Sequence, residues 1–298
     1  MTARREPAGI LRHAEQLSER LLHRLSGRLP ASLGLRLLYL RRHGRLPRLN
    51  PPRTFTEKVL HRRLTDRNPD LLILADKLRV KPLIADQLGA DWVTPTLWSG
   101  AQLPLRSNRD WPLPFVLKAN WGSGKNIFVR TERERDWDAI ERIVAQWISA
   151  PYPAGVHHWH AGSIGRSLLV EPYVGSPGAL PLDYKFYVFG GKARFIQVNT
   201  ARDTGIRTTV YDPNWTKQPF EMSCPSEAGD LERPASLDRM IAAAELLAAE
   251  WDFLRVDFYE VGGRPIFGEI SPTPLGGMAA FQPRCWDRLF GDLWPEGR

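Results

Sequence analysis

A lysine and a short glycine-rich loop lie next to each other in the segment PFVLKANWGSGK. Lys118 belongs to a predicted strand, residues 115–119, and the loop after it consists of Gly122, Ser123, Gly124 and Lys125. Glycines let main-chain N–H groups approach phosphate oxygens, and lysines add positive charge beside them. The spacing of a Walker loop is absent, and a second predicted strand, residues 126–130, follows instead of a helix. The segment predicts a phosphate-binding loop, with a plain hairpin turn as the alternative.

Two acidic residues interrupt apolar runs near the end of the chain. Asp257 lies in the predicted strand FLRVDFYEV and Glu269 in the predicted strand RPIFGEISP. A carboxylate among apolar neighbours is costly to bury unless a cation compensates it. Oxygen ligands of this kind suit Mg²⁺ that also contacts nucleotide phosphates. The alternative is a pair of surface acids on an amphipathic hairpin.

The register of this hairpin decides whether the two acids can share a metal. A two-residue turn at Gly262 and Gly263 would pair Glu269 with Val256 and send the acids to opposite faces. A bulge, or a loop longer by an odd number of residues, would bring them together. We therefore predict that Asp257 lies opposite Glu269, with Arg255 on the same face.

A third segment, LVEPYV at residues 169–174, predicts a strand that ends in a short connection before LDYKFYVFGGK. The exposed main chain at such a connection offers the donors and acceptors that an adenine edge requires. Asp183 could bind a ribose hydroxyl. Glu171 also has a simpler interpretation as a solvated residue of an edge strand.

The composition excludes several classes of protein. No apolar run reaches the roughly 18 residues of a membrane span, and the start lacks the apolar block of a secretory signal, so we expect a cytoplasmic protein. Cys224 and Cys285 are too far apart for a zinc motif and too few for a disulfide framework. His157, His158 and His160 lie in a segment rich in Pro and Gly without helical spacing, which disfavours a metal site.

The positive charge is concentrated at the start of the chain. Residues 1–50 contain 11 Arg and 3 Glu, a balance of 11 − 3 = +8, which equals the net charge of the whole protein. Apolar residues recur there at helical steps, at Leu11, Ala14, Leu17, Leu21, Leu25 and Leu29. This basic amphipathic helical leader could cover the protein itself or contact an anionic surface, including the inner face of a membrane. Nucleic acid is the least favoured partner.

The remaining pattern predicts a mixed α+β fold of two or three subdomains, because strands and helices do not alternate regularly. Pro47, Pro51 and Pro52 place a boundary near residue 50. Thr54 or Thr56 can cap a helix that begins with Glu57. The other predicted helices are residues 77–88, 135–148 and 236–250. The other predicted strands are residues 167–174, 184–190, 193–199, 253–260 and 264–270.

Taken in order, six segments resemble those of ATP-grasp proteins, and more narrowly of the TupA-like branch. They are ADK at 75–77, FVLKANWGSG at 115–124, LVEPYV at 169–174, DYKFYVFGGK at 183–192, LRVDFY at 254–259 and FGEISP at 267–272. The resemblance implies two α+β subdomains that grip ATP between antiparallel sheets. It places an N-terminal helical region at 51–112, a small subdomain at 113–175 and a large one at 176–298.

The resemblance also implies roles for individual residues. Lys118 and Lys185 would contact phosphates, and the loop from Gly122 to Lys125 would close over them. Glu171, Tyr173 and Val174 would form the adenine hinge, and Asp183 would bind the ribose. Asp257 and Glu269 would hold Mg²⁺, and Arg255 would stabilise a charged tetrahedral species. Ser271 stands where the family usually has Asn, so it is the candidate third metal ligand.

The activity implied by the resemblance is that of an ATP-dependent carboxylate–amine ligase that acts through an acylphosphate. Its substrates would be a uronic-acid-type carboxylate and an amine in cell-envelope polysaccharide biosynthesis. Two alternatives remain open. One is a kinase that phosphorylates a sugar or another hydroxyl compound, and the other is a basic scaffold that binds an anionic glycan or membrane through residues 1–50.

Overall fold

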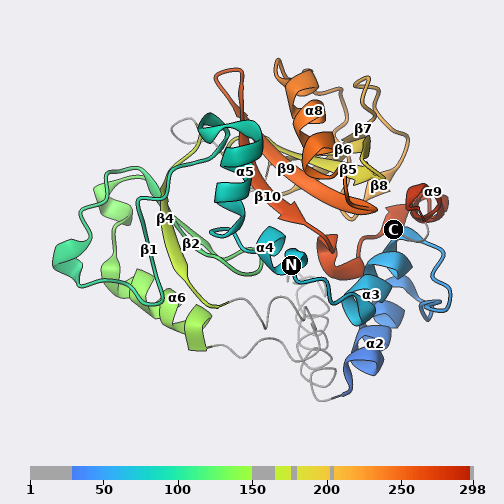
Figure 1. Cartoon of the computed structure of the whole chain (residues 1–298), viewed down its shortest axis with the longest axis horizontal. Helices are drawn as coiled ribbons and strands as arrows, with labels where there is room; N and C mark the ends of the chain where they lie inside the picture. Colours follow the sequence, from blue (N-terminus) through green and yellow to red (C-terminus); the bar gives the residue numbers. More distant parts are fainter. Residues whose placement is uncertain (1–28, 150–164, 176–179, 202–204, 296–298) are drawn as a thin grey trace, which may run out of the picture.

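The computed structural model describes residues 29–149, 165–175, 180–201 and 205–295. A helical N-terminal region precedes two units that are each built on an antiparallel sheet (Figure 1). The α+β prediction is confirmed. The first 28 residues of the predicted leader helix and the segment with the three histidines lie outside the described residues. No helix in the described ranges is long and apolar enough to cross a membrane.

The described helices of the N-terminal region are α2 (Ala31–His43), α3 (Phe55–Thr65), α4 (Asp70–Ala75) and α5 (Val80–Leu88). Thr54 caps α3, and its side chain and that of Glu57 form a reciprocal capping box, which confirms one of the two predicted caps. The helix begins at Phe55, two residues before the predicted start. The predicted helix at 77–88 begins three residues later, because Asp76 Oδ1 accepts hydrogen bonds from the N–H groups of Leu78 and Arg79. This turn places Lys77 just before the helix.

The smaller sheet has the order β1-β4-β2-β3. Its strands are β1 (Trp98–Gly100), β2 (Phe115–Ala119), β3 (Asn126–Val129) and β4 (Leu168–Pro172). Helix α6 (Trp137–Ser149) covers one face, where Phe115 and Leu117 pack in a buried core. Because side chains alternate along a strand, Val116 and Lys118 point to the other face.

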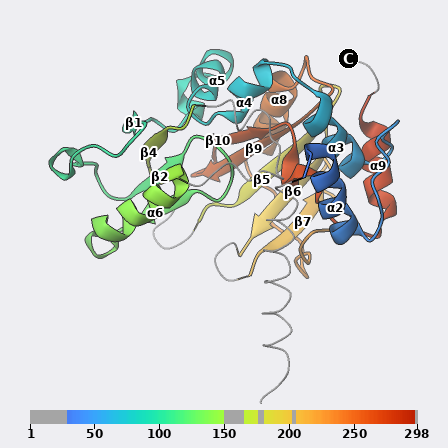
Figure 2. The ribbon, with the colours of Figure 1, turned by 90° about the horizontal axis from the view of Figure 1, so that it is seen from below.

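The larger sheet has the order β10-β9-β5-β6-β7. Its strands are β5 (Asp183–Phe189), β6 (Lys192–Thr200), β7 (Arg207–Tyr211), β9 (Phe253–Val261) and β10 (Arg264–Ser271). One face packs against α8 (Leu237–Leu247), α4 and α5 (Figures 1 and 2). All seven residues of β5 are buried, so this strand forms the centre of the unit.

The opposite face of the larger sheet is divided into an aromatic part and a polar part. Tyr187 and Phe189 of β5 join an aromatic cluster with α3 and α9 (Cys285–Leu293). Phe55 lies at its centre, with ring centroids 5.1 Å from Phe253 and 5.7 Å from Phe290. The short strands β8 (Glu221–Met222) and β11 (Phe281–Gln282) pair beside this cluster. The polar part of the face begins at Lys185, two residues before Tyr187 on the same strand.

The hairpin between β9 and β10 has the predicted register. Asp257 lies opposite Glu269, and a bulge separates Phe267 from Glu269. Gly268 is the extra residue, and a Cβ atom there would lie 3.0 Å from the carbonyl oxygen of Asp257, so little space exists for a side chain. The bulge places both carboxylates on the polar face of the sheet. The subdomain limits at residues 113, 175 and 176 remain predictions.

Candidate functional site

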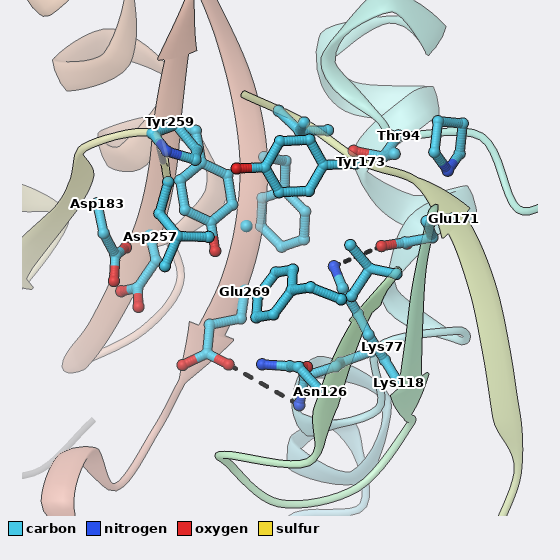
Figure 3. A pocket seen from close by; sticks show the side chains of 18 of the residues that line it. Lys77, Thr94, Lys118, Asn126, Glu171, Tyr173, Asp183, Asp257, Tyr259 and Glu269 are labelled. Carbon is cyan, nitrogen blue, oxygen red and sulfur yellow. Dashed lines mark hydrogen bonds and ion pairs between the residues drawn. The ribbon is translucent and has the colours of Figure 1, made fainter. Parts of the chain in front are cut away.

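A cavity of about 240 Å³ lies between the two sheets (Figure 3). Its walls come from β2, β3 and β4 on one side and from β5, β9 and β10 on the other. The predicted site residues on these walls are Lys118, Ser123, Gly124, Glu171, Tyr173, Val174, Asp183, Lys185, Asp257 and Glu269. The structure thus brings together segments that are more than 100 residues apart in the sequence.

Four predicted residues lie outside the cavity walls. Gly122 and Lys125 are sequence neighbours of wall residues in the glycine-rich loop, and Gly122 and Gly124 have φ of +71° and +73°. Arg255 and Ser271 are partners in the ladder of the hairpin. Ser271 is therefore on the same face as Glu269, two pairs further along the hairpin.

The acids of the hairpin form a network with two buried cations. Lys185 Nζ donates to Asp257 Oδ2 over 2.6 Å and lies 2.7 Å from Asp183 Oδ2. Arg255 donates to both oxygens of Asp257 over 2.7 Å. It also donates to Glu269 Oε1 over 2.8 Å. The carboxylates are thus held in fixed positions by donors from β5 and β9.

Burial and these cations act on the acids in opposite directions. Burial raises the pKa of Asp257, which is only 1% exposed, although Arg255 and Lys185 oppose the change. Burial would also raise the pKa of Glu269, but Lys77, Arg255 and Lys185 outweigh it and lower this pKa to about 2. Burial disfavours the charged form of Lys185, yet Asp257 and Asp183 raise its pKa above the usual value. Glu269 is accordingly a carboxylate at neutral pH.

A second network joins the smaller sheet to α5. Glu171 is 4% exposed and its Oε2 accepts a 2.5 Å hydrogen bond from Lys118 Nζ. Its other oxygen forms an ion pair with Lys81. Burial would raise the pKa of Glu171, but Lys118 and Lys81 lower it below the usual value. Both oxygens of the predicted hinge acid therefore interact with lysines.

Lys77 connects the two sides of the cavity. Its Nζ donates to the carbonyl oxygen of Gly122 over 2.6 Å and lies 3.9 Å from Glu269 Oε2 (Figure 3). Burial lowers the pKa of Lys77, and Glu269 opposes this change. The ammonium group thus links the glycine-rich loop to the strand that carries the metal-binding candidates.

Apolar and aromatic side chains also line the cavity. Its lining includes Val93, Val116, Phe128, Tyr173, Val174, Tyr259 and Phe267. The N–H of Tyr173 donates to the carbonyl oxygen of Pro114, which ties the predicted hinge to β2. A cavity lined by both cations and aromatic side chains suits a molecule with a phosphate chain and a flat ring.

The residues fit Mg²⁺ only together with a ligand that supplies further oxygens. Within the described ranges, no group of three or more His, Cys, Asp and Glu residues could hold a metal ion. Asp257 and Glu269 face each other across the hairpin and provide two carboxylates. Mg²⁺ commonly uses one or two carboxylates and completes its shell with phosphate oxygens and water. This donor set agrees with a nucleotide-dependent metal site.

Lys77 and Lys81 are site residues that the sequence did not predict. Lys77 was only part of the ADK segment, and Lys81 follows it after four residues. A helix start that places two lysines one turn apart could have suggested that both point to the same side. Asn126 and Thr94 also line the cavity, and no motif indicated them.

Two antiparallel sheets that enclose a charged cavity, with a glycine-rich loop on one side and paired acids on the other, are the arrangement expected of the ATP-grasp class. The family model described as TupA-like ATPgrasp matches residues 57–294. The chain belongs to this family and has its fold. No curated protein matches the chain.

Several solved structures are similar to the chain. D-alanine–D-alanine ligase from Bacillus anthracis complexed with ATP is 16% identical, with a TM-score of 0.44 over 74% of this chain and 63% of that one. The D-cycloserine synthetase DcsG is 18% identical, with a TM-score of 0.43 over 76% and 70%. N5-carboxyaminoimidazole ribonucleotide synthetase from Thermus thermophilus is 19% identical, with a TM-score of 0.40 over 70% and 47%. The chain spans less than two thirds of the Bacillus ligase.

Proposed function

We propose that this protein is an ATP- and Mg²⁺-dependent carboxylate–amine ligase that forms ADP and acts through an acylphosphate. The observation that carries the proposal is the cavity between the sheets, where Asp257 and Glu269 face a set of lysines. Membership of the TupA-like ATP-grasp family supports the use of ATP. In the reaction, a substrate carboxylate takes the terminal phosphoryl group of ATP, and an amine then displaces phosphate to form an amide.

The lysines of the cavity would bind the phosphates. Lys77, from the turn before α5, Lys118 of β2 and Lys185 of β5 all line the cavity, so they can surround a phosphate chain. Asp257 and Glu269 would hold Mg²⁺, which neutralises phosphate charge when it is bound. Fixed charges of this kind stabilise the charge that develops during phosphoryl transfer.

Arg255 would stabilise the oxyanion that forms when the amine attacks the acylphosphate. Its guanidinium is buried and fixed by three charge-assisted hydrogen bonds of 2.7 to 2.8 Å. Because these bonds hold the group in one orientation, little reorganisation would accompany the reaction. Ser271, its partner in the ladder, would complete the oxygen ligands of the metal.

We further propose that the carboxylate belongs to a uronic acid or a related glycan component of the cell envelope, with an amino acid or another amine as the acceptor. The resemblance to the TupA-like branch supports this substrate class. We place the protein in the cytoplasm, with contact to an anionic membrane face through residues 1–50. Exposed Leu33, Leu40 and Leu46 lie in the described part of this segment, and residues 29–56 contain no acid.

A hydroxylamine trap tests the proposal directly. The protein is incubated with ATP, Mg²⁺ and a panel of uronic acids, and hydroxylamine converts an acylphosphate into a hydroxamate that mass spectrometry detects. Wild type should form hydroxamate and ADP with at least one carboxylate, whereas Lys118→Met and Asp257→Asn should form neither. Arg288→Met, which alters an exposed ion pair with Asp292, is the matched control. A stable phosphorylated hydroxyl compound in place of a hydroxamate would instead establish a kinase.

The same variants test the scaffold alternative. A scaffold that binds an anionic glycan or membrane through residues 1–50 would keep its function in Lys118→Met and lose it after deletion of the leader. A ligase should instead lose hydroxamate formation in Lys118→Met and keep it after deletion of the leader. No nucleotide turnover with any carboxylate or hydroxyl compound would refute the enzymatic proposal.

A further inference from the structure

Two lysines contact the same carboxylate, and their surroundings differ. Lys81 interacts with Glu171 Oε1, and its Nζ also donates to the carbonyl oxygen of Thr94 over 2.8 Å and to Thr96 Oγ1 over 2.7 Å. An ammonium group has three N–H donors, so these three acceptors use all of them. Lys81 is therefore fixed between α5, β4 and the segment before β1 and has no donor left for a ligand.

Lys118 is bound much less completely. Within the described part of the chain, Glu171 Oε2 is the one hydrogen-bond partner of its Nζ, and the side chain is 26% exposed against 15% for Lys81. Two of its donors therefore remain for a ligand in the cavity. Figure 3 shows Lys118 in the cavity wall, with a dashed line to Glu171. A phosphate in the cavity would approach this side chain.

The carboxylate between them cannot lose both partners. Glu171 is 4% exposed, and an unpaired carboxylate at such a site is strongly unfavourable. If Lys118 turned toward a phosphate, Glu171 would depend on Lys81 alone for compensation. With Lys81 in place, the move of Lys118 from Glu171 to a phosphate leaves the ion pair between Lys81 and Glu171 intact.

We propose that Lys81 is a positioning residue that keeps Glu171 paired while Lys118 leaves this carboxylate to bind the phosphates of the nucleotide. The inference rests on the proposed function, because it assigns phosphate binding to Lys118. Without Lys81, Glu171 holds Lys118 as its last cation, and phosphate must compete against a stronger ion pair. Lys81 thereby increases phosphate affinity although it does not touch the ligand.

Calorimetric titration with inorganic tripolyphosphate tests this role, because the probe lacks adenine and reports on phosphate binding alone. Wild type should bind it, and Lys81→Met should weaken its binding by about tenfold, the factor that corresponds to about 1.4 kcal/mol. Lys81→Arg, which keeps the charge, should recover most of the affinity. Lys192→Met removes a lysine from an exposed pair with Glu245 and should leave the affinity unchanged.

The decisive measurement is the double variant Lys81→Met/Glu171→Gln. With a neutral amide in place of the carboxylate, nothing holds Lys118 back, so binding should return to within about threefold of wild type, a difference of less than about 1 kcal/mol. If Lys81 acts only as a strut for Thr94 and Thr96, the double variant should bind as weakly as Lys81→Met, which would overturn the inference. Unchanged binding by Lys81→Met would do the same.

Separate titration of wild type with ATP distinguishes this inference from the proposed function. ATP binding together with a negative result for Lys81→Met leaves the ligase proposal standing and rejects the positioning role. Absence of both ATP and tripolyphosphate binding by wild type rejects both. Binding of ATP without tripolyphosphate rejects the exchange of Lys118 from Glu171 to phosphate.

Discussion

Replacement of Arg255 by Met should destabilise the protein far more than removal of a surface arginine. Arg255 makes hydrogen bonds of 2.7, 2.7 and 2.8 Å to Asp257 and Glu269. The side chains of Arg255 and Asp257 are 7% and 2% exposed, so water cannot replace these contacts without local opening. The variant leaves Lys185 as the direct cationic partner of Asp257.

The expected loss is about 3–5 kcal/mol of unfolding free energy, the range for breaking a buried ion pair by removal of one partner. Arg288→Met is the control, since Arg288 and Asp292 also lie 2.7 Å apart but are 51% and 57% exposed. An exposed pair of this kind contributes about 0.3–0.5 kcal/mol. Arg288 donates to Asp292 through Nε, whereas Arg255 makes three hydrogen bonds to two acids, so the difference between the variants measures burial together with the additional hydrogen bonds.

Urea denaturation at about pH 8 and about pH 5 checks both the magnitude and its cause. Burial already raises the pKa of Asp257, and loss of Arg255 should raise it further. The folded variant would then hold a proton that the unfolded chain releases, so its deficit relative to wild type should shrink as the pH falls. A deficit below about 1 kcal/mol at the higher pH, or one that does not change at the lower pH, would refute this reasoning.

Three further predictions concern single side chains. The folded pKa of Glu269 is about 2, so its carboxylate stabilises wild type above pH 4.5 and this stability is lost toward pH 2. Glu269→Gln should lack this contribution, which we expect to be about 1–2 kcal/mol in acid denaturation curves because the side chain is a third exposed. Burial lowers the pKa of His43 to about 4, so wild type should lose about 1 kcal/mol of unfolding free energy as the pH falls from 6.5 to 4. His43→Gln should not show this loss. Phe55→Ala should cost about 3–5 kcal/mol in urea, against less than about 0.5 for Leu105→Ala at a 75% exposed position; comparable losses would contradict the central place of Phe55.

The strands of the site could be predicted from the sequence because their residues carry a local signal. Strand β2 has the predicted limits, and β4, β5, β6, β9 and β10 differ from prediction by no more than two residues at either end. Apolar and β-branched runs mark buried strands wherever they occur. The pairing of Asp257 with Glu269 was also predictable, because chemistry required both acids on one face and only a bulge or an odd loop could place them there.

Contacts between distant elements were not predictable in the same way. Lys81 reaches Glu171 because α5 packs beside the end of β4, and neither segment indicates the other. The role of Phe55 depends on aromatic residues from several separate elements that meet only in the folded chain. The short strands β8 and β11, with two residues each, are defined by their pairing and have too few residues for a periodic signal.

The bulge at Gly268 has a consequence for the evolution of this family. With a two-residue turn at Gly262 and Gly263, the extra residue between Phe267 and Glu269 is what places the acid at position 269 opposite Asp257. A lineage that lost Gly268 would still place the acid opposite Asp257, one position earlier in the sequence. The number of residues between the two acids is therefore free to vary among relatives, whereas the face that they share is not. Alignments of such relatives should be anchored on the paired acids and should allow a gap at the bulge.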